Sequence, residues 1–139
     1  MMTTHGKGTF EIKSWDENTW DGIPHKDVQG AKQTYAVVKQ LFHGVIEGES
    51  EAHSVMTYRD DGSANYVGLQ TVRGKIGDRS GTFVIQSVGA YDPKTGVAAT
   101  DLTIIPGSGT GQLTGLSGKG TYTATHGDQQ PYTLDYDFT

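Results

Sequence analysis

The stretch Ile105-Pro106-Gly107-Ser108-Gly109-Thr110-Gly111-Gln112-Leu113-Thr114-Gly115-Leu116 decides how the chain is interpreted. Its glycines could either cradle a phosphate group or allow a sharp change of backbone direction. A phosphate-binding P-loop needs Gly-x-x-x-x-Gly-Lys-Ser/Thr between a strand and a helix, and this stretch lacks that lysine. A dinucleotide fingerprint needs Gly-x-Gly-x-x-Gly. Gln112 breaks it when it starts at Gly107, and Thr114 breaks it when it starts at Gly109. We therefore interpret the stretch as a structural corner.

Outside the corner, the chain alternates between apolar and polar residues, as expected of strands with one buried face. No segment shows convincing helical spacing of its apolar residues. Short turn signals separate the alternating runs, at Gly48-Glu49, Asp61-Gly62, Gly77-Asp78 and 92–96. The expected strands cover 7–15, 34–47, 51–59, 64–72, 81–91, 97–105, 120–125 and 132–138, with a long loop at 16–30.

About eight strands without crossover helices predict an up-and-down antiparallel sheet. Closure into a barrel removes exposed sheet edges, so we expect one all-β antiparallel barrel domain over residues 1–139. A β-sandwich is the structural alternative. In the barrel, Leu113 and Leu116 of the corner would form a short turn that plugs one end.

Composition narrows the functional classes. The 139 residues carry a net charge of −5 with scattered basic residues, whereas nucleic-acid binding would need a basic face. The chain has no cysteine, no apolar run long enough to span a bilayer and no charged start followed by an apolar signal segment. We expect a cytoplasmic protein with neither nucleic acid nor membrane as partner.

The sequence contains only weak signals for a metal site and none for a catalytic nucleophile. His43 and His53 are equally far from Gly48 and could meet across a hairpin, but nothing fixes a third metal ligand. A solvated polar face is the favoured interpretation of both. No Gly-x-Ser-x-Gly motif and no cysteine nucleophile occur. We therefore predict no metal site and no cofactor.

Polar residues among apolar strand positions are the remaining candidates for a site. A buried glutamate would have a raised pKa suited to acid–base work, while Tyr and Gln could hydrogen bond to a ligand. The alternative for each is an ordinary rim or solvent-facing position. The candidates are Glu11 as the catalytic group and, for ligand binding, Tyr58, Tyr66, Gln70, Gln86 and Tyr122.

Strand register decides which candidates face inward. A two-residue turn at Asp61-Gly62 places Tyr58 opposite Asn65 and puts Tyr66 and Gln70 on the other face. A slip of one residue or a bulge exchanges the faces. The sequence leaves this choice open, and both faces could be partly buried if the outer wall packs in a homo-oligomer.

Several short motifs occur in the same order in this chain and in a known family. They are 8–12 (GTFEI) with Trp15-Asp16, 44–48 (GVIEG), 81–86 (GTFVIQ), the corner at 106–116 and the ending 132–136 (YTLDY). This set resembles an uncharacterised, mainly bacterial family of similar length with an allene-oxide-cyclase-like barrel. The resemblance covers nearly the whole chain.

The corner is also distantly similar to that of allene oxide cyclases and dirigent proteins. Those proteins hold a reactive lipid or phenolic intermediate in a barrel and guide its ring closure or coupling without a cofactor. Phe10-Glu11-Ile12 matches the cyclase first strand, whose Glu is implicated in the reaction, which implies a catalytic role for Glu11. Lys13 stands where the cyclases have Asn.

Two functions follow from these observations, with a third alternative. The barrel could be a cofactor-independent cyclase or isomerase that encloses a small hydrophobic molecule and fixes its reactive conformer. It could equally be a binding barrel without catalysis. A structural, oligomeric module with a filled core is the third alternative, because small barrels permit one. An open cavity with a carboxylate would favour the enzyme, and a purely apolar cavity the carrier.

Overall fold

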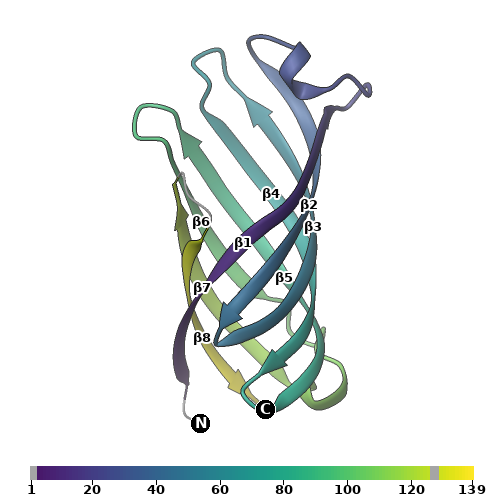
Figure 1. Cartoon of the computed structure of the whole chain (residues 1–139), viewed down its shortest axis with the longest axis vertical. Coiled ribbons are helices and arrows are strands. Elements are labelled where there is room, and N and C mark those ends of the chain that lie inside the picture. The colour runs from purple at the N-terminus through teal and green to yellow at the C-terminus, as the bar shows by residue number, and fades with distance from the viewer. Residues whose placement is uncertain (1–2, 126–128) are drawn as a thin grey trace.

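The computed structural model describes residues 3–125 and 129–139, which form an antiparallel barrel (Figure 1). Its elements are β1 (Thr4–Thr19), η1 (His25–Asp27), β2 (Lys32–Gly44), β3 (Ile46–Tyr58), β4 (Ala64–Ile76), β5 (Arg79–Asp92), β6 (Val97–Ile104), η2 (Gly111–Leu113), β7 (Leu116–Ala124) and β8 (Gln130–Phe138).

Each strand pairs with its neighbours in chain order, and β8 closes the barrel on β1. Hydrogen-bonded partners followed once around from Trp15 return to β1 at Thr4, which means that the strands are strongly tilted. The predicted all-β, eight-stranded antiparallel barrel is confirmed. Among the described residues, no helix is long and apolar enough to cross a membrane.

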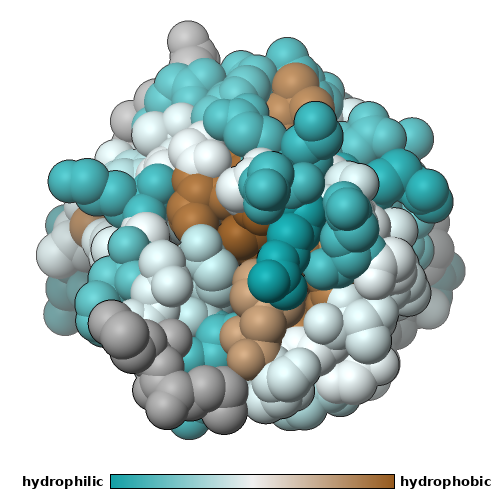
Figure 2. All heavy atoms as spheres, turned by 90° about the horizontal axis from the view of Figure 1, so that it is seen from below, coloured by the Kyte–Doolittle hydropathy of each residue, from teal (hydrophilic) through white to brown (hydrophobic). Residues whose placement is uncertain are grey.

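The glycine-rich corner closes the lower end of the barrel, as predicted. Leu113 of η2 and Leu116 at the start of β7 are buried in the core. Gly107, Gly111 and Gly115 have positive φ angles, which side chains rarely tolerate. Polar side chains dominate the view of this end from below, around a small apolar centre (Figure 2).

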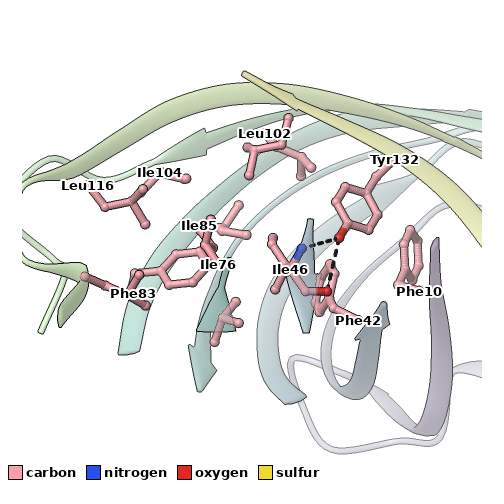
Figure 3. Close-up of a cluster of buried hydrophobic side chains, with 13 residues drawn as sticks. Phe10, Phe42, Ile46, Ile76, Phe83, Ile85, Leu102, Ile104, Leu116 and Tyr132 are labelled. Carbon is pink, nitrogen blue, oxygen red and sulfur yellow. Dashed lines mark hydrogen bonds between the residues drawn. The ribbon is translucent and has the colours of Figure 1, made fainter. Parts of the chain in front are cut away.

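The lower half of the barrel is filled by large apolar side chains (Figure 3). Phe10, Phe42 and Tyr132 pack with ring centroids 5.8 and 5.4 Å apart, Phe42 being the shared partner. The rest of this cluster consists of Ile46, Val72, Ile76, Phe83, Ile85, Leu102, Ile104, Leu113, Leu116 and Leu134. The packed core therefore lies at one end of the barrel.

The upper half has small side chains at its inward positions. On β3 and β4 these include Ala52, Ser54 and Ala64, and on β5 and β6 they include Ser87 and Ala98. Such residues cannot fill an eight-stranded barrel, whose interior is just wide enough for ordinary side chains. A cavity is the consequence.

Two hairpin turns differ from the sequence prediction. The β2–β3 turn lies at Gly44, which has φ +99°, and Gly48 lies inside β3 instead. A Cβ on Gly48 would clash with the Arg73 carbonyl oxygen of β4, so this glycine permits close strand approach. Between β3 and β4, the hydrogen bond from Arg59 N to Ser63 O encloses a three-residue turn that ends in left-handed Gly62, and Tyr58 consequently pairs with Ala64.

The first strand is also longer than predicted. It continues to Thr19 rather than ending at Trp15, after a register shift between Ile12 and Ser14. The shift changes which residues face inward: Phe10 and Ile12 before it, Trp15 and Glu17 after it. The predicted loop at 16–30 is thus wrong for its first four residues.

The outer face of the barrel carries a row of apolar side chains across neighbouring strands. Tyr35, Val55, Val67 and Val88 are partners in successive ladders and are each exposed. Exposed rows of this kind often take part in contacts between proteins. Association into a homo-oligomer stays a prediction.

Candidate functional site

A cavity of about 640 Å³ occupies the upper half of the barrel. This volume lies within the usual range for small-molecule sites, roughly 300–1,000 Å³. The cavity floor adjoins the packed core at Phe10 and Gln70, and its mouth reaches His25 of η1. No Lys or Arg of the described residues lines it, whereas Glu11 and Glu17 both do.

One side of the cavity is a free strand edge. In the described part of the chain, β1 pairs with β8 only up to Phe10; beyond it, β1 pairs with β2 and forms one isolated bridge, from Asn18 to Pro24. Figure 1 shows β1 crossing the front of the barrel diagonally, with this segment leading away from β7 and β8. Ile12 and Trp15 on this segment are 46% and 49% exposed, and both line the cavity. A ligand could enter here or between the upper turns.

Glu17 is the buried carboxylate of the site, with a side chain only 2% exposed. Its Oε2 accepts hydrogen bonds from Tyr58 Oη at 2.6 Å and Thr34 Oγ1 at 2.7 Å. Its Oε1 accepts from Trp15 Nε1 at 3.0 Å and lies 3.8 Å from His25 Nε2. Three neutral donors from β1, β2 and β3 thus hold one carboxylate in the cavity wall.

Tyr58 is kept protonated by this arrangement. Burial, followed by the hydrogen bond to Glu17 and its charge, raises the pKa of Tyr58 well above its ordinary range. The phenol therefore donates to Glu17 at neutral pH. Its oxygen keeps lone pairs that can accept a hydrogen bond from a ligand.

A second polar group lies on β4, β6 and β7. Tyr66 Oη is 2.5 Å from Thr100 Oγ1, and Tyr122 lines the same part of the cavity. Burial raises the pKa of Tyr122 well above its ordinary range, and the neighbouring Tyr66 adds to the effect. A Cβ on Gly89 would lie 2.6 Å from the Tyr66 ring, so glycine lets this ring lie flat on β5.

Gln70 belongs to the cavity floor. It is 5% exposed, and its Oε1 is buried with no hydrogen-bond partner among the described residues. Val72, the next inward residue of β4, is already part of the packed core. An unpaired buried carbonyl is unusual, since buried polar groups are generally hydrogen bonded.

Glu11 lines the cavity from its free edge rather than from inside the barrel. It lies 3.3 Å from Lys13 Nζ and 3.5 Å from His43 Nε2, and Gln129 Nε2 donates to it at 3.3 Å. The Lys13 hydrogen bond, with help from His43, lowers the pKa of Glu11. Glu11 therefore lacks the raised pKa that is expected of a buried acid–base group.

The structure therefore brings most of the residues predicted from the sequence to one cavity. Tyr58, Tyr66, Gln70 and Tyr122 line one cavity, with Glu11 at its edge. Gln86 does not join them, because it lies on the outer face of β5, paired with Leu69 and Thr103. The register that the sequence left open is settled by the β3–β4 turn, which pairs Tyr58 with Ala64 and so places Tyr58 on the same face as Tyr66 and Gln70.

Glu17 was missed by the sequence interpretation, which placed it in a loop. The signal was present: Trp15, Glu17 and Thr19 continue the alternation with a shift of one residue from Phe10 and Ile12. A bulge produces such a shift. Without the partner strand, the shift is indistinguishable from the end of the strand.

The two histidines do not meet. His43 lies near Glu11 and Glu47, whereas His53 hydrogen bonds with Tyr35 and Glu51. Within residues 3–125 and 129–139, no cluster of three or more His, Cys, Asp or Glu side chains could hold a metal ion. The absence of a metal site and of a cofactor stays a prediction.

Comparison with known proteins identifies the family. The model of a protein family of unknown function, DUF3224, matches residues 6–136. A crystal structure of a protein of unknown function from the same family, from Shewanella oneidensis MR-1, is 26% identical, with a TM-score of 0.80 over 99% of both chains. No curated protein matches the chain. The likeness to allene oxide cyclases stays a prediction. Because the family model spans nearly the whole sequence, the chain belongs to the DUF3224 family.

Proposed function

We propose that the barrel binds a small, mainly apolar molecule in the cavity of its upper half. The observation that carries the proposal is the contrast between the two halves. Large side chains fill the lower half, while alanine, serine and glycine leave about 640 Å³ open above it. A domain with no use for this space would gain stability by filling it. The cavity argues against a module with a filled core.

The lining supports a mostly apolar ligand with a few directed polar contacts. Phe10, Ile12, Trp15, Val38 and Met56 provide apolar surface. The main polar groups are the Glu17 cluster, the Tyr66–Thr100 pair, Gln70 at the floor and Glu11 at the edge. The other polar lining residues include Gln40, Ser54, Ser87, Tyr122, Thr125 and Gln130. This combination is typical of sites where apolar contact supplies affinity and polar groups fix orientation.

A second candidate function is cofactor-independent isomerisation or cyclisation. The buried Glu17 carboxylate favours it over passive binding, because a purely apolar cavity would offer no proton acceptor. Such a reaction moves a proton within one molecule and needs no co-reactant. Glu11, the carboxylate implied by the cyclase resemblance, would serve at the cavity edge, and Glu17 from the buried wall.

Dye binding tests the proposed cavity. Wild-type protein is titrated with the neutral dye N-phenyl-1-naphthylamine, whose emission rises in apolar surroundings. The Ala98→Leu variant places a larger side chain in the cavity, and Ala99→Leu places it on the outer face of the same strand. We expect the first variant to weaken dye binding at least tenfold and the second to leave it unchanged.

Native mass spectrometry of freshly purified protein complements the titration. A co-purified small molecule in wild type, reduced in Ala98→Leu, would identify the ligand, and the same spectrum counts subunits. Equal dye binding by all three proteins would contradict the proposed function. If a ligand is recovered, incubation in D₂O with wild type and Glu17→Gln tests for proton transfer by deuterium incorporation.

A further inference from the structure

We propose that the cavity selects neutral ligands carrying a hydrogen-bond donor, such as a hydroxyl group, and that this donor binds Gln70 Oε1 at the floor. The inference rests on the proposed ligand-binding function and names the chemistry of the ligand. Two independent observations carry it: the unpaired carbonyl of Gln70 and the charge of the cavity lining.

The side-chain carbonyl of Gln70 at the cavity floor lacks a hydrogen-bond donor, which a ligand could supply. Gln70 Oε1 is shielded from solvent and has no hydrogen-bond partner in the described structure. The flanking inward positions of β4 are Gly68, which has no side chain, and Val72, which has no polar atom. A polar group left this way destabilises the folded protein unless a further molecule pairs with it. Oε1 is shielded from the cavity as well, so a ligand hydroxyl group would pair with it after the Gln70 side chain, which lines the cavity, rotates to turn this oxygen toward the ligand.

The remaining polar atoms of the cavity also favour donors. The Tyr58 hydroxyl group already donates its hydrogen bond to Glu17, so its oxygen can only accept a hydrogen bond from a ligand. Glu17 itself adds carboxylate oxygens, and no Lys or Arg lines the described cavity to balance an anion. His25, at the mouth, already faces Glu17. A carboxylate or phosphate ligand would therefore be desolvated beside Glu17 without a Lys or Arg as partner, which is unfavourable.

Three naphthalene derivatives test this selectivity by calorimetric titration at neutral pH. The compounds are 2-naphthol, which has a donor, 2-methoxynaphthalene, which has none, and 2-naphthoate, which is anionic. We expect wild type to bind 2-naphthol about tenfold more tightly than the methyl ether, the usual effect of one hydrogen bond to a buried partner. Binding of 2-naphthoate should be the weakest.

The decisive variant is Gln70→Leu, which keeps the approximate size and removes the carbonyl. Its preference for 2-naphthol over the ether should fall to about onefold, with affinity for the ether unchanged or improved. Gln86→Leu is the matched control, because Gln86 lies on the outer face of β5. This control should retain the full preference.

A measurement without ligand makes the test independent of the probes chosen. If the carbonyl is unpaired in the free protein, Gln70→Leu should raise the midpoint of thermal unfolding by roughly 3–5 °C. A lower midpoint would assign Gln70 a structural role and overturn the inference. Equal binding of 2-naphthol and its ether by wild type, an unchanged preference in Gln70→Leu, or tightest binding of 2-naphthoate would also overturn it.

The naphthyl dye separates the two proposals. Dye binding that is lost in Ala98→Leu, combined with no preference for 2-naphthol, would reject donor selection and retain the cavity as a ligand site. Dye binding that is equal in wild type, Ala98→Leu and Ala99→Leu would reject the proposed function itself. A raised midpoint in Gln70→Leu would still support an unpaired floor carbonyl in that case.

Discussion

At the scale of single residues, Tyr132 joins the end of one hairpin to the core. Its hydroxyl accepts from Ile46 N at 3.0 Å and donates to His43 O at 3.0 Å (Figure 3 shows the contact with Ile46). Tyr132→Phe would leave the buried Ile46 amide without its partner. We expect the free energy of unfolding in urea to fall by about 1–3 kcal/mol. A change below about 0.5 kcal/mol would mean that another group takes over this hydrogen bond.

The same residue makes stability depend on pH in the alkaline range. Burial, with a contribution from the charge of Glu47, raises the pKa of Tyr132 from its ordinary value of 10.0 to about 12. Since the folded state holds this proton more tightly, its contribution is complete below pH 10 and is lost as pH rises toward 12. The stability difference between wild type and Tyr132→Phe should therefore shrink from pH 9 to pH 11. A difference that grows would contradict the assignment.

Tyr58 provides a second test at this scale. Tyr58→Phe removes one of the donors to the buried Glu17 carboxylate and should cost about 1–3 kcal/mol in chemical denaturation. Tyr35→Phe is the matched control, because its hydroxyl contacts exposed His53 on the outer face. The control should change stability by less than about 0.5 kcal/mol. Equal losses in both variants would mean that Glu17 does not depend on Tyr58.

At the scale of elements, the corner at 105–116 replaces a missing stretch of strand beside the lower part of β5. Side-chain oxygens accept from β5 amides: Ser108 Oγ from Val84 N and Thr110 Oγ1 from Thr82 N, both at 3.0 Å. Backbone bonds alternate with them, from Ile105 N to Val84 O and from Thr110 N to Thr82 O. The corner thus covers an edge that β6 is too short to pair.

Removing one of these oxygens should expose that edge. Ser108→Ala leaves the Val84 amide unpaired, so we expect a loss of about 1 kcal/mol and faster hydrogen exchange at Val84. Thr114→Ala is the control within the same corner, because its hydroxyl donates only to Gly111 O at the surface. Unchanged exchange at Val84 in the Ser108 variant would show that solvent or another group already protects the amide.

The elements also show what the sequence could predict. Alternation located the strands, and the glycine spacing at 105–116 matched neither of two phosphate-binding motifs, because both signals depend on local sequence. Register was harder: Asp61-Gly62 predicts a hairpin, but only the partner strand distinguishes a two-residue from a three-residue loop. The one-residue difference in loop length decides that Tyr58 lies on the same face as Tyr66 and Gln70. The bulge in β1, which hides Glu17, has the same origin.

At the scale of the whole molecule, the barrel divides into a packed lower half and an open upper half. The division follows from side-chain size at inward positions, which is present in the sequence but cannot be used until the inward face is known. On β5, for example, Phe83 and Ile85 precede Ser87 and Gly89 along the inward face. Large residues thus give way to small ones along one strand, where the core ends and the cavity begins.

Two neighbouring inward positions of β5 test this boundary directly. Ile85 is 1% exposed in the packed core, so Ile85→Ala should create a new cavity and cost about 2–5 kcal/mol. Ser87 lines the existing cavity, so Ser87→Val adds apolar volume where space is available and should be neutral or stabilising. Urea unfolding of both variants measures the contrast. A loss above about 1 kcal/mol in Ser87→Val would mean that the upper half is already closely packed, because overpacking costs about that much, and the barrel would then lack room for a ligand.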